Sequence, residues 1–438
     1  MTFTEAEQFL YSLSNLPRKE YMTGPRDCDE YLLRLQFFLD ILENPEKNIP
    51  HYIHIPGTSG KGSTVNCLHS ILACAGKKVA STTSPHPTTI TERWKVGNTF
   101  MTKKEFIDII EKLKPKLDEY IRTSPYDILS YFDMTTAIAL YYFAKKKVDW
   151  AILEVGCGGT YDATNVIPYK DVAVITNIGL DHTTLLGNTK TEIAKRKAGI
   201  ITDKTNVFSA ETSPQIVSII KKSAEKKHSS FTLASKKDLT NISIDLRGTT
   251  FTFQKKQYHT TAIGKHQATN AALAICIARS LDIKKDSIKK GIAKANQPLR
   301  MDVISQKPLI IIDGAHNPDK IKTTVTGVTQ AFRLDHKNDT HLIVGFSGNK
   351  DLKKMIKQLV ELKPVSVACT RNTINHFRKV ASPSELAPLW KKEKTNARLE
   401  QFLDPADALA CTLKIAKKND LILVTGSLFL ASEIKGLL

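Results

Sequence analysis

The sequence predicts an α/β protein with two domains, and three observations lead to this fold class. Short apolar runs such as Asp149–Val155 and Asp171–Ile175 have the composition of strands that are buried on both faces of a sheet. Segments with helical spacing of apolar residues separate these runs, and such alternation is typical of mostly parallel sheets. A second strand series follows Pro298, so we expect a larger N-terminal domain of the P-loop type over residues 1–297 and a smaller, Rossmann-like domain over residues 298–438.

Individual elements follow from the same patterns. A short apolar strand over His51–Pro56 runs into a glycine-rich turn, and the first 50 residues have mainly helical spacing. The Thr- and Phe-rich alternation between Thr240 and Ala262 indicates antiparallel strands between the two series. We further expect helices over residues 64–75, 106–120, 134–147 and 267–281, and C-terminal strands over residues 309–312, 342–345, 365–369 and 421–425.

Composition limits the class of protein and its compartment. With 438 residues and 41% hydrophobic content, the chain can bury more than one core. Its seven cysteines form no CxxC pair, and their odd number argues against a disulfide framework or a zinc finger. We therefore expect a reducing, cytoplasmic compartment. The N-terminus does not have the pattern of a signal peptide, and no apolar run is long enough to cross a bilayer, so we expect no membrane partner.

The formal net charge is +19, from 63 Lys and Arg against 44 Asp and Glu. A charge of this size can bind nucleic acid, cover a solvated surface or attract anionic substrates. The lysines are scattered in short runs and aromatic residues are sparse, so we expect no nucleic-acid partner. The sequence does not decide between the other two explanations.

The most specific local pattern lies between the strand at residue 51 and the helix that follows it. Glycines let backbone N–H groups approach a phosphate closely, and a helix N-terminus favours anions. A lysine adds positive charge, and a hydroxyl can lie near a metal ion. The pattern departs from the usual Walker spacing because Gly62 separates the lysine from the hydroxyls, and a glycine-rich turn without a ligand is the alternative. We predict that it contacts ATP through Gly57, Thr58, Gly60, Lys61, Gly62, Ser63 and Thr64.

A carboxylate ends another predicted strand. Glu154 is followed by the turn Gly156–Gly159. Ligands of parallel α/β sheets bind at the carboxyl ends of the strands. Mg²⁺ takes hard oxygen ligands from one or two carboxylates and from substrate phosphates. Glu154 therefore suits a magnesium ligand, and a charge at a helix N-terminus is the alternative.

Several blocks together resemble the Mur ligase superfamily and, within it, the folylpolyglutamate synthase/dihydrofolate synthase family. HIPGTSGKGST is similar to the family's GTNGKGS loop, with Ser59 in place of Asn. EVGCGGTYDATN is similar to EVGLGGRLDATN, with Cys157 for Leu and Thr160 for Arg. Asp133 stands where many relatives have Glu. The further blocks follow in family order: SPH at 84–86, ITNIGLDH at 175–182, KRKAGI at 195–200 for EKAGI, GKHQ at 264–267, PLR at 298–300 for PGR, and DGAHNP at 313–318.

The resemblance implies a metal site and a modified lysine. Ser84, Glu154 and His182 would hold Mg²⁺, with two sites expected. Lys197 would be carried as a carbamate formed with CO₂, which turns a cation into an anion that can support a metal ion.

The resemblance also assigns the nucleotide contacts beyond the loop. Gln267 and Asn270 would lie around the base, and Arg300, Asp313 and His316 would contact the rest of ATP. Leu299 replaces the family's Gly before Arg300, so the turn there is expected to differ. Catalytic roles are implied for Lys61, Lys197, Arg300 and His316.

The implied activity is that of an ATP-dependent, ADP-forming ligase. A carboxylate becomes an acyl phosphate, and the amine of L-glutamate then displaces the phosphate. The acid would be dihydropteroate or a folate whose glutamyl tail is extended, and the sequence does not decide between them. A monomer is expected from the family. The alternatives are another Mur-type amino acid ligase and, from a different class, a P-loop ATP-binding switch.

Overall fold

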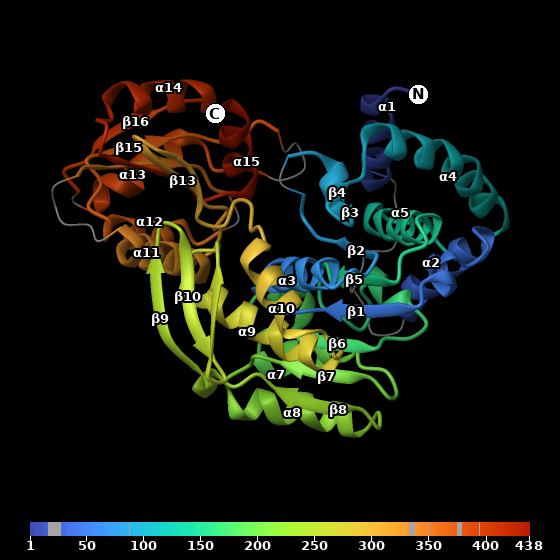
Figure 1. The fold of residues 1–438 in the computed structure, drawn as a ribbon. Helices are drawn as coiled ribbons and strands as arrows, with labels where there is room; N and C mark the ends of the chain where they lie inside the picture. The colour runs from blue at the N-terminus through green and yellow to red at the C-terminus, as the bar shows by residue number, and fades with distance from the viewer. Residues whose placement is uncertain (16–27, 87, 333–337, 349, 375–378, 394) are drawn as a thin grey trace. The chain divides into compact units, whose positions relative to one another are not determined.

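The computed structural model describes all residues of the chain except 16–27, 87, 333–337, 349, 375–378 and 394. Contacts divide the chain into two compact units (Figure 1). The sequence-based boundary between residues 297 and 298 stays a prediction. The N-terminal unit comprises Met1–Thr240, Thr252–Tyr258 and Thr269–Ala295, and the C-terminal unit comprises Asn241–Phe251, His259–Ala268 and Asn296–Leu438.

The N-terminal unit is built on an eight-stranded sheet in the order β4-β3-β2-β5-β1-β6-β7-β8. The strands from β2 to β8 in this order are parallel, whereas β3 and β4 pair antiparallel at one edge. The two apolar runs used in the prediction form β5 and β6, whose residues are all buried. The strands are β1 (His51–Ile55), β2 (Val79–Thr82), β3 (Trp94–Val96), β4 (Thr99–Phe100), β5 (Trp150–Glu154), β6 (Val172–Ile175), β7 (Asn206–Ser209) and β8 (Ser230–Leu233).

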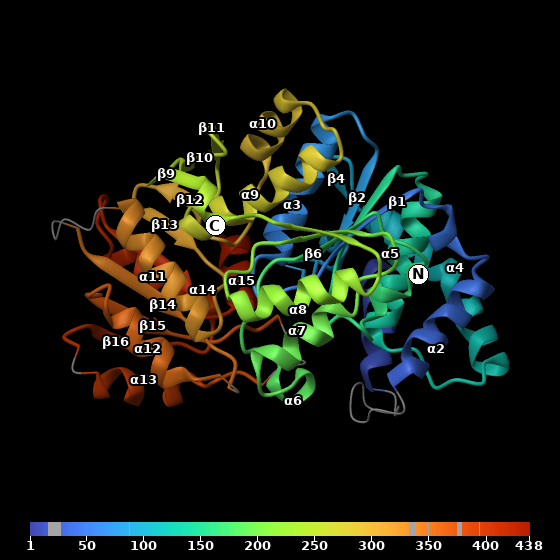
Figure 2. The same cartoon turned by 90° about the horizontal axis from the view of Figure 1, so that it is seen from below.

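Helices cover this sheet and bury two apolar clusters. One cluster lies among α1, α2, α4, α5 and the sheet, and another lies under α7 and α8, which run side by side (Figure 2). Four helices, α1, α4, α5 and α7, begin with a capping box that satisfies their first free N–H groups. The helices are α1 (Phe3–Ser12), α2 (Cys28–Ile41), α3 (Lys61–Cys74), α4 (Lys103–Thr123), α5 (Tyr131–Lys145), α6 (Thr183–Leu186), α7 (Lys190–Ala198), α8 (Pro214–Glu225) and α10 (Lys285–Lys294), with single 3₁₀ turns at Leu13–Asn15, Pro45–Asn48, Ile90–Arg93, Ala163–Val166 and Lys236–Asp238.

The predicted antiparallel insertion is a three-stranded sheet in the order β11-β10-β9. Its strands are β9 (Leu239–Asp245), β10 (Gly248–Phe253) and β11 (Lys256–Thr260). Two-residue turns join them, and only antiparallel neighbours can be joined by so short a connection. The helix α9 (Lys265–Ser280) follows, and the division between the units falls within it.

The C-terminal unit has a six-stranded sheet in the order β12-β13-β17-β14-β15-β16, parallel except for β12. Successive strand residues face opposite cores: Ile311 packs with α11, α12 and α13, whereas Ile310 and Ile312 pack with α14 and α15. Both faces are therefore covered, as the sequence predicted. The elements are β12 (Asp302–Gln306), β13 (Leu309–Ile312), α11 (Pro318–Phe332), β14 (Thr340–Val344), α12 (Leu352–Val360), β15 (Ser366–Cys369), α13 (Pro383–Lys392), β16 (Arg398–Gln401), α14 (Pro405–Ile415), β17 (Leu421–Thr425) and α15 (Leu428–Leu437).

Two further features concern the described residues as a whole. None of the helices in the described ranges combines the length and apolar character that a membrane crossing requires. Six cysteines are free thiols: Cys67, Cys74, Cys157, Cys276, Cys369 and Cys411.

Candidate active site

The predicted phosphate loop joins β1 to α3, and its backbone requires glycine. Gly60 caps α3 with a left-handed φ of 82°. A Cβ on Gly60 would lie 2.4 Å from Oδ1 of Asn270. A Cβ on Gly57 would lie 1.8 Å from Oγ1 of Thr176. The loop is therefore packed closely against Asn270 and Thr176. The loop ends at the N-terminus of α3, where the first N–H groups of the helix have no partner within the helix.

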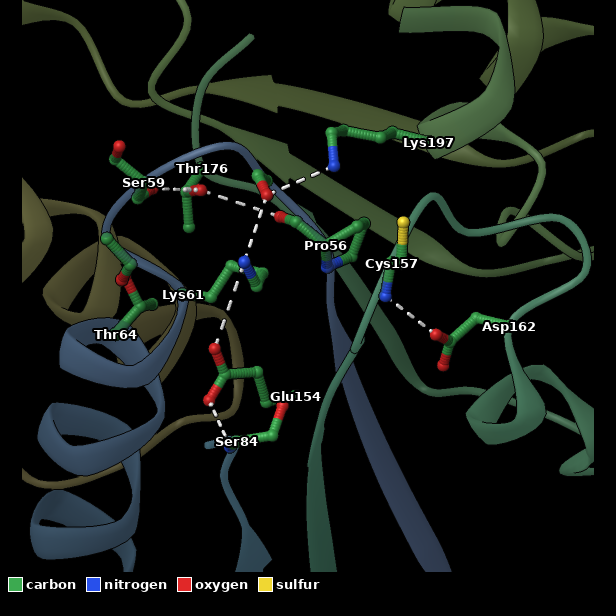
Figure 3. Close-up of polar contacts among 12 residues, drawn as sticks. Pro56, Ser59, Lys61, Thr64, Ser84, Glu154, Cys157, Asp162, Thr176 and Lys197 are labelled. Atoms are coloured by element: carbon green, nitrogen blue, oxygen red, sulfur yellow. Dashed lines mark hydrogen bonds and ion pairs between the residues drawn. The ribbon is translucent and has the colours of Figure 1, made fainter. Parts of the chain in front are cut away.

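The segment after β6 holds the phosphate loop in place (Figure 3). The Thr176 hydroxyl donates to the carbonyl of Ser59 at 2.7 Å, and the N–H of Ser59 donates to Oδ1 of Asn177 at 2.8 Å. Thr58 exchanges two hydrogen bonds with the backbone of Gly179, at 3.1 and 2.9 Å. The sequence suggested a metal ligand in this segment but gave no sign that it also fixes the loop.

Two lysines point at one carbonyl of the loop (Figure 3). Nζ of Lys61 donates to the carbonyl of Gly57 at 3.2 Å, and Nζ of Lys197 donates to the same oxygen at 3.1 Å. Lys197 lies in the last turn of α7 and is only 5% exposed. Burial, and next the charge of Lys61, lower the pKa of Lys197 from 10.5 to about 8. Two lysine amines therefore lie at one loop carbonyl, and one of them has a lowered pKa.

Glu154 ends β5 beside the same helix N-terminus. Its side chain is buried, and its Oε2 accepts the N–H of Ser84 at 3.0 Å. Its Oε1 lies 3.9 Å from Nζ of Lys61. A Cβ on Gly62 would lie 3.3 Å from this carboxylate, so the first turn of α3 and the end of β5 meet here. The structure thus brings together Lys61, Ser84 and Glu154, which the sequence placed up to 93 residues apart.

The residues at this place fit a magnesium ion. A carboxylate and a hydroxyl beside a loop for phosphates are the hard oxygen donors that Mg²⁺ takes. Across the described ranges, no three or more His, Cys, Asp and Glu side chains gather in a way that could hold a metal ion.

His182 caps the short helix α6 in a left-handed conformation with φ of 49° and is exposed. The two remaining loop residues lie at the start of α3, where Ser63 is buried and the Thr64 hydroxyl donates to the carbonyl of Gly60 at 2.9 Å.

In the C-terminal unit, Asp313 follows β13 and is buried. Its carboxylate accepts the N–H of Met301 at 2.8 Å, the N–H of Ala315 at 2.9 Å and the hydroxyl of Thr324 at 2.7 Å. These contacts hold the turn that follows the strand. They use much of the carboxylate's capacity to accept hydrogen bonds. The family resemblance assigns this carboxylate to nucleotide binding.

His316 and Arg300 lie close to this turn. Nδ1 of His316 bonds to the carbonyl of Gly314 at 2.8 Å, and its Nε2 lies 2.9 Å from Nζ of Lys320. Burial, and next the charge of Lys320, hold the pKa of His316 well below 6.5, so the ring is neutral. Nη1 of Arg300 donates to the carbonyl of Leu299 at 3.0 Å. Leu299 adopts a left-handed φ of 56°, so this chain keeps a glycine-like turn without the glycine.

The two predicted base contacts both lie in the first turns of α9. Gln267 is buried and belongs to the segment of α9 that is assigned to the C-terminal unit. Asn270 belongs to the N-terminal unit, where it lies against Gly60. The sequence reasoning did not identify the Thr176–Asn177 pair, because it acts on Ser59, which lies more than 100 residues earlier in the chain. It also did not single out Lys320 or Asp162, although both contact residues within five positions of themselves. Asp162 is fully buried and accepts the N–H of Cys157 at 2.9 Å.

Comparisons with known proteins agree with this fold. The model of the Mur ligase middle domain matches residues 55–278, and that of the Mur ligase glutamate ligase domain matches residues 299–428. The chain is 32% identical over 418 residues to "Dihydrofolate synthase/folylpolyglutamate synthase" of Bacillus subtilis, which covers 92% of this chain and 93% of the relative.

Solved structures lead to the same group of proteins. The crystal structure of folylpolyglutamate synthase from Thermotoga maritima superposes with a TM-score of 0.83 at 27% identity, over 100% of this chain and 96% of that one. Escherichia coli FolC in complex with DHPP and ADP superposes with a TM-score of 0.80 at 26% identity, over 99% and 97%. The chain therefore belongs to the Mur ligase family. Its relatives within that family are the folylpolyglutamate and dihydrofolate synthases.

Proposed function

We propose that this protein is an ATP-dependent, ADP-forming ligase that adds L-glutamate to dihydropteroate, to the glutamyl tail of folates, or to both. The observation that carries the proposal is the meeting of Lys61, Lys197 and Glu154 at a glycine loop before a helix N-terminus. Relatives over nearly the whole chain are named for this activity, and a related structure contains ADP with DHPP. We further propose that it works in the cytoplasm, as a monomer with the domain boundary at residues 297/298.

The reaction follows from the charges at the loop. An oxygen of the bound carboxylate attacks the γ-phosphorus of ATP, the bond to the bridging oxygen breaks, and ADP leaves. The amine of glutamate then attacks the acyl carbon, loses a proton and displaces inorganic phosphate. Lys61 and the N–H groups at the start of α3 lie where the phosphates would bind, so they stabilise the charge on the transferring group. Such chemistry needs positioning more than a protein nucleophile.

The metal ligands are part of the proposal. Glu154 and Ser84 would hold one Mg²⁺, and His182 would help to hold a second. When bound, Mg²⁺ neutralises phosphate charge during the transfer. The hydrogen bond from the Ser84 N–H to Glu154 keeps that carboxylate beside the first turn of α3.

The environment of Lys197 supports the carbamate. Only a neutral amine attacks CO₂, with formation of a C–N bond and loss of a proton. With a pKa of about 8, roughly a tenth of the Lys197 amines are neutral at pH 7, which is about 300 times the fraction for an ordinary lysine. The carbamate would be an anion next to Lys61, so the repulsion between the two lysines would become an attraction.

The C-terminal contacts rest on the family resemblance. We propose that Arg300 contacts the phosphates, Asp313 the ribose and His316 the nucleotide, with Gln267 and Asn270 around the base. The neutral ring of His316 suits stacking or a hydrogen bond rather than charge neutralisation.

A substrate screen tests the proposal. Purified protein is given ATP, Mg²⁺ and glutamate with either dihydropteroate or tetrahydrofolate, and the products are measured by mass together with ADP. We expect ADP release that depends on glutamate and a product heavier by one glutamyl residue. ADP release that is independent of glutamate would instead support a P-loop switch.

A further inference from the structure

A chain of buried polar side chains runs from β1 to the turn after β5. His54 in β1 is 0% exposed, and its Nε2 lies 2.7 Å from Oγ1 of Thr164. The Thr164 hydroxyl donates to Oδ1 of Asp162 at 2.5 Å. Oδ2 of Asp162 accepts the N–H of Cys157 at 2.9 Å. The proposed reaction assigns no role to His54 or Thr164, and polar groups this deep in a sheet cost stability unless they are paired.

The direction of each hydrogen bond follows from the chemistry of the groups. Burial, and next the charge of Lys170, hold the pKa of His54 well below 6.5, so its ring is neutral and carries one N–H. The single hydrogen of the Thr164 hydroxyl points to Asp162, so Nε2 of His54 is the donor to the threonine oxygen. Nδ1 is then the unprotonated nitrogen, which agrees with its having no hydrogen-bond partner within the described structure. The chain has one consistent arrangement of protons.

Asp162 anchors the turn that follows Glu154. It is buried, and besides the Cys157 N–H it accepts the N–H of Thr164 at 3.1 Å. Burial raises its pKa to about 6, and the donors around it oppose that rise, so it is mainly ionised at pH 7. A carboxylate with several fixed donors is a rigid anchor, because moving the turn would leave a buried charge unpaired.

The anchored turn also borders the helix that carries Lys197. A Cβ on Gly159 would lie 2.8 Å from the carbonyl of Arg196. The N–H and the hydroxyl of Thr160 both donate to that carbonyl at 3.0 Å. On the other side, β1 and β5 are paired in register, with Ile55 opposite Glu154. One chain of hydrogen bonds therefore connects strand β1, the turn that follows Glu154 and the end of α7.

We propose that His54 and Thr164 are positioning residues of the ligase: through Asp162 they hold the turn at residues 156–160 against α7, and so they keep Lys197 buried at the phosphate loop. The inference rests on the proposed function for its kinetic readout only. The chemical state of Lys197 can be measured without substrates.

Thr164→Val tests the proposal because it keeps the shape of the side chain and removes the hydroxyl. The pKa of Lys197 is measured by competitive labelling of amines across pH, with the labelled peptide quantified by mass. We expect a midpoint near pH 8 in the natural protein and an increase of at least about one unit in Thr164→Val, because a loosened turn admits water to the amine. We also expect kcat to fall at least about tenfold, with a smaller change in KM for ATP.

Three variants make the test specific. Thr164→Ser retains the hydroxyl and should restore both the midpoint and kcat. His54→Gln keeps a donor near Nε2 and should be milder than His54→Leu. Thr412→Val is the matched control, because Thr412 is equally buried and donates to the carbonyl of Ala408 at 2.7 Å within α14; it should leave the midpoint unchanged.

The outcomes separate this inference from the proposed function. An unchanged Lys197 midpoint in Thr164→Val, with kcat like that of Thr412→Val, would overturn the inference and leave the ligase activity standing. If Thr164→Val does not fold, the midpoints of the two His54 variants decide, and equal values would overturn it. Absence of glutamate-dependent turnover in the natural protein would remove the proposed function, while the labelling result would still decide whether the chain of side chains controls Lys197.

Discussion

The phosphate loop and the turn at residues 313–316 both follow the end of a strand, one in each sheet, yet the charged side chains at the two turns have different hydrogen-bond partners. Both turns follow a buried parallel strand and precede a helix. At the first turn, the backbone is fixed from outside by Thr176 and Asn177, and the lysine amines point at the loop. At the second, the buried carboxylate of Asp313 is itself the anchor of its turn. Position at a strand end therefore does not separate a ligand contact from a structural anchor, whereas the partners of the side chain do.

The largest effect is expected from removing charge at the first turn. Lys61→Ala and Glu154→Ala should each lower kcat/KM by at least about a thousandfold, because each removes a group that we propose contacts the transferring phosphate or its metal. ADP formation measures the effect, and circular dichroism checks the fold. Lys116→Ala is the control, since its surface ion pair with Glu119 contributes little, and it should stay within about twofold. Full activity in both site variants would refute the assignment.

A second prediction concerns the pH and CO₂ dependence of Lys197. Because the pKa of this amine is lowered to about 8, the neutral fraction rises as pH increases from 6 to 9. At a fixed concentration of dissolved CO₂, activity should rise over this range and should fall when CO₂ is removed. Lys197→Ala should lose about a hundredfold in kcat. A carbamate carbon signal in NMR with labelled CO₂, absent from Lys197→Ala, provides the direct check; equal activity with and without CO₂ would count against the modification.

A third prediction separates anchor from ligand at the second turn. Asp313→Ala should lower the free energy of unfolding by about 2–4 kcal/mol, because two buried N–H groups and one hydroxyl lose their acceptor. Thr324→Val should cost about 1 kcal/mol, because it removes a single donor. Denaturant unfolding measures both. If Asp313→Ala is as stable as the natural protein but binds ATP much more weakly, the carboxylate serves mainly the nucleotide.

The smallest effect is expected at His316. Burial and Lys320 hold its pKa well below 6.5, so Lys320→Met should raise that pKa. Because a depressed histidine pKa makes folding less favourable as pH falls below about 6.5, the variant should also be less sensitive to acid. Titration of the ring by NMR checks the shift, and an unchanged pKa would show that burial alone sets it.

Much of the fold follows from local patterns in the sequence. The apolar runs gave the central strands of both sheets, and the alternating segment near residue 250 gave the three-stranded insertion. Among the strands that the sequence analysis missed, β3, β4 and β16 are brief and exposed or partly exposed, so they lack an apolar run. Helices α3 and α4 begin three residues before their predicted starts, because the polar residues of their first turns carry no apolar signal. Helix α5 also begins three residues early, at Tyr131.

Part of the candidate site could likewise be predicted from the sequence, and part could not. Lys61 and Glu154 could be predicted because each lies in a motif at a strand end. The link from His54 to Thr164 could not, because its members are 110 residues apart and His54 looks like a single polar residue in an apolar strand. The hydrogen bonds that Asp313 accepts could not be predicted either, because their donors include Met301 and Thr324 in neighbouring elements.

A crystal structure of the protein with a non-hydrolysable ATP analogue and Mg²⁺ tests the central claim most directly. The account predicts phosphates on the loop at residues 57–64, with Nζ of Lys61 and backbone N–H groups from the start of α3 within hydrogen-bonding distance. A well-ordered loop without phosphates, or a nucleotide bound elsewhere on the chain, would contradict it.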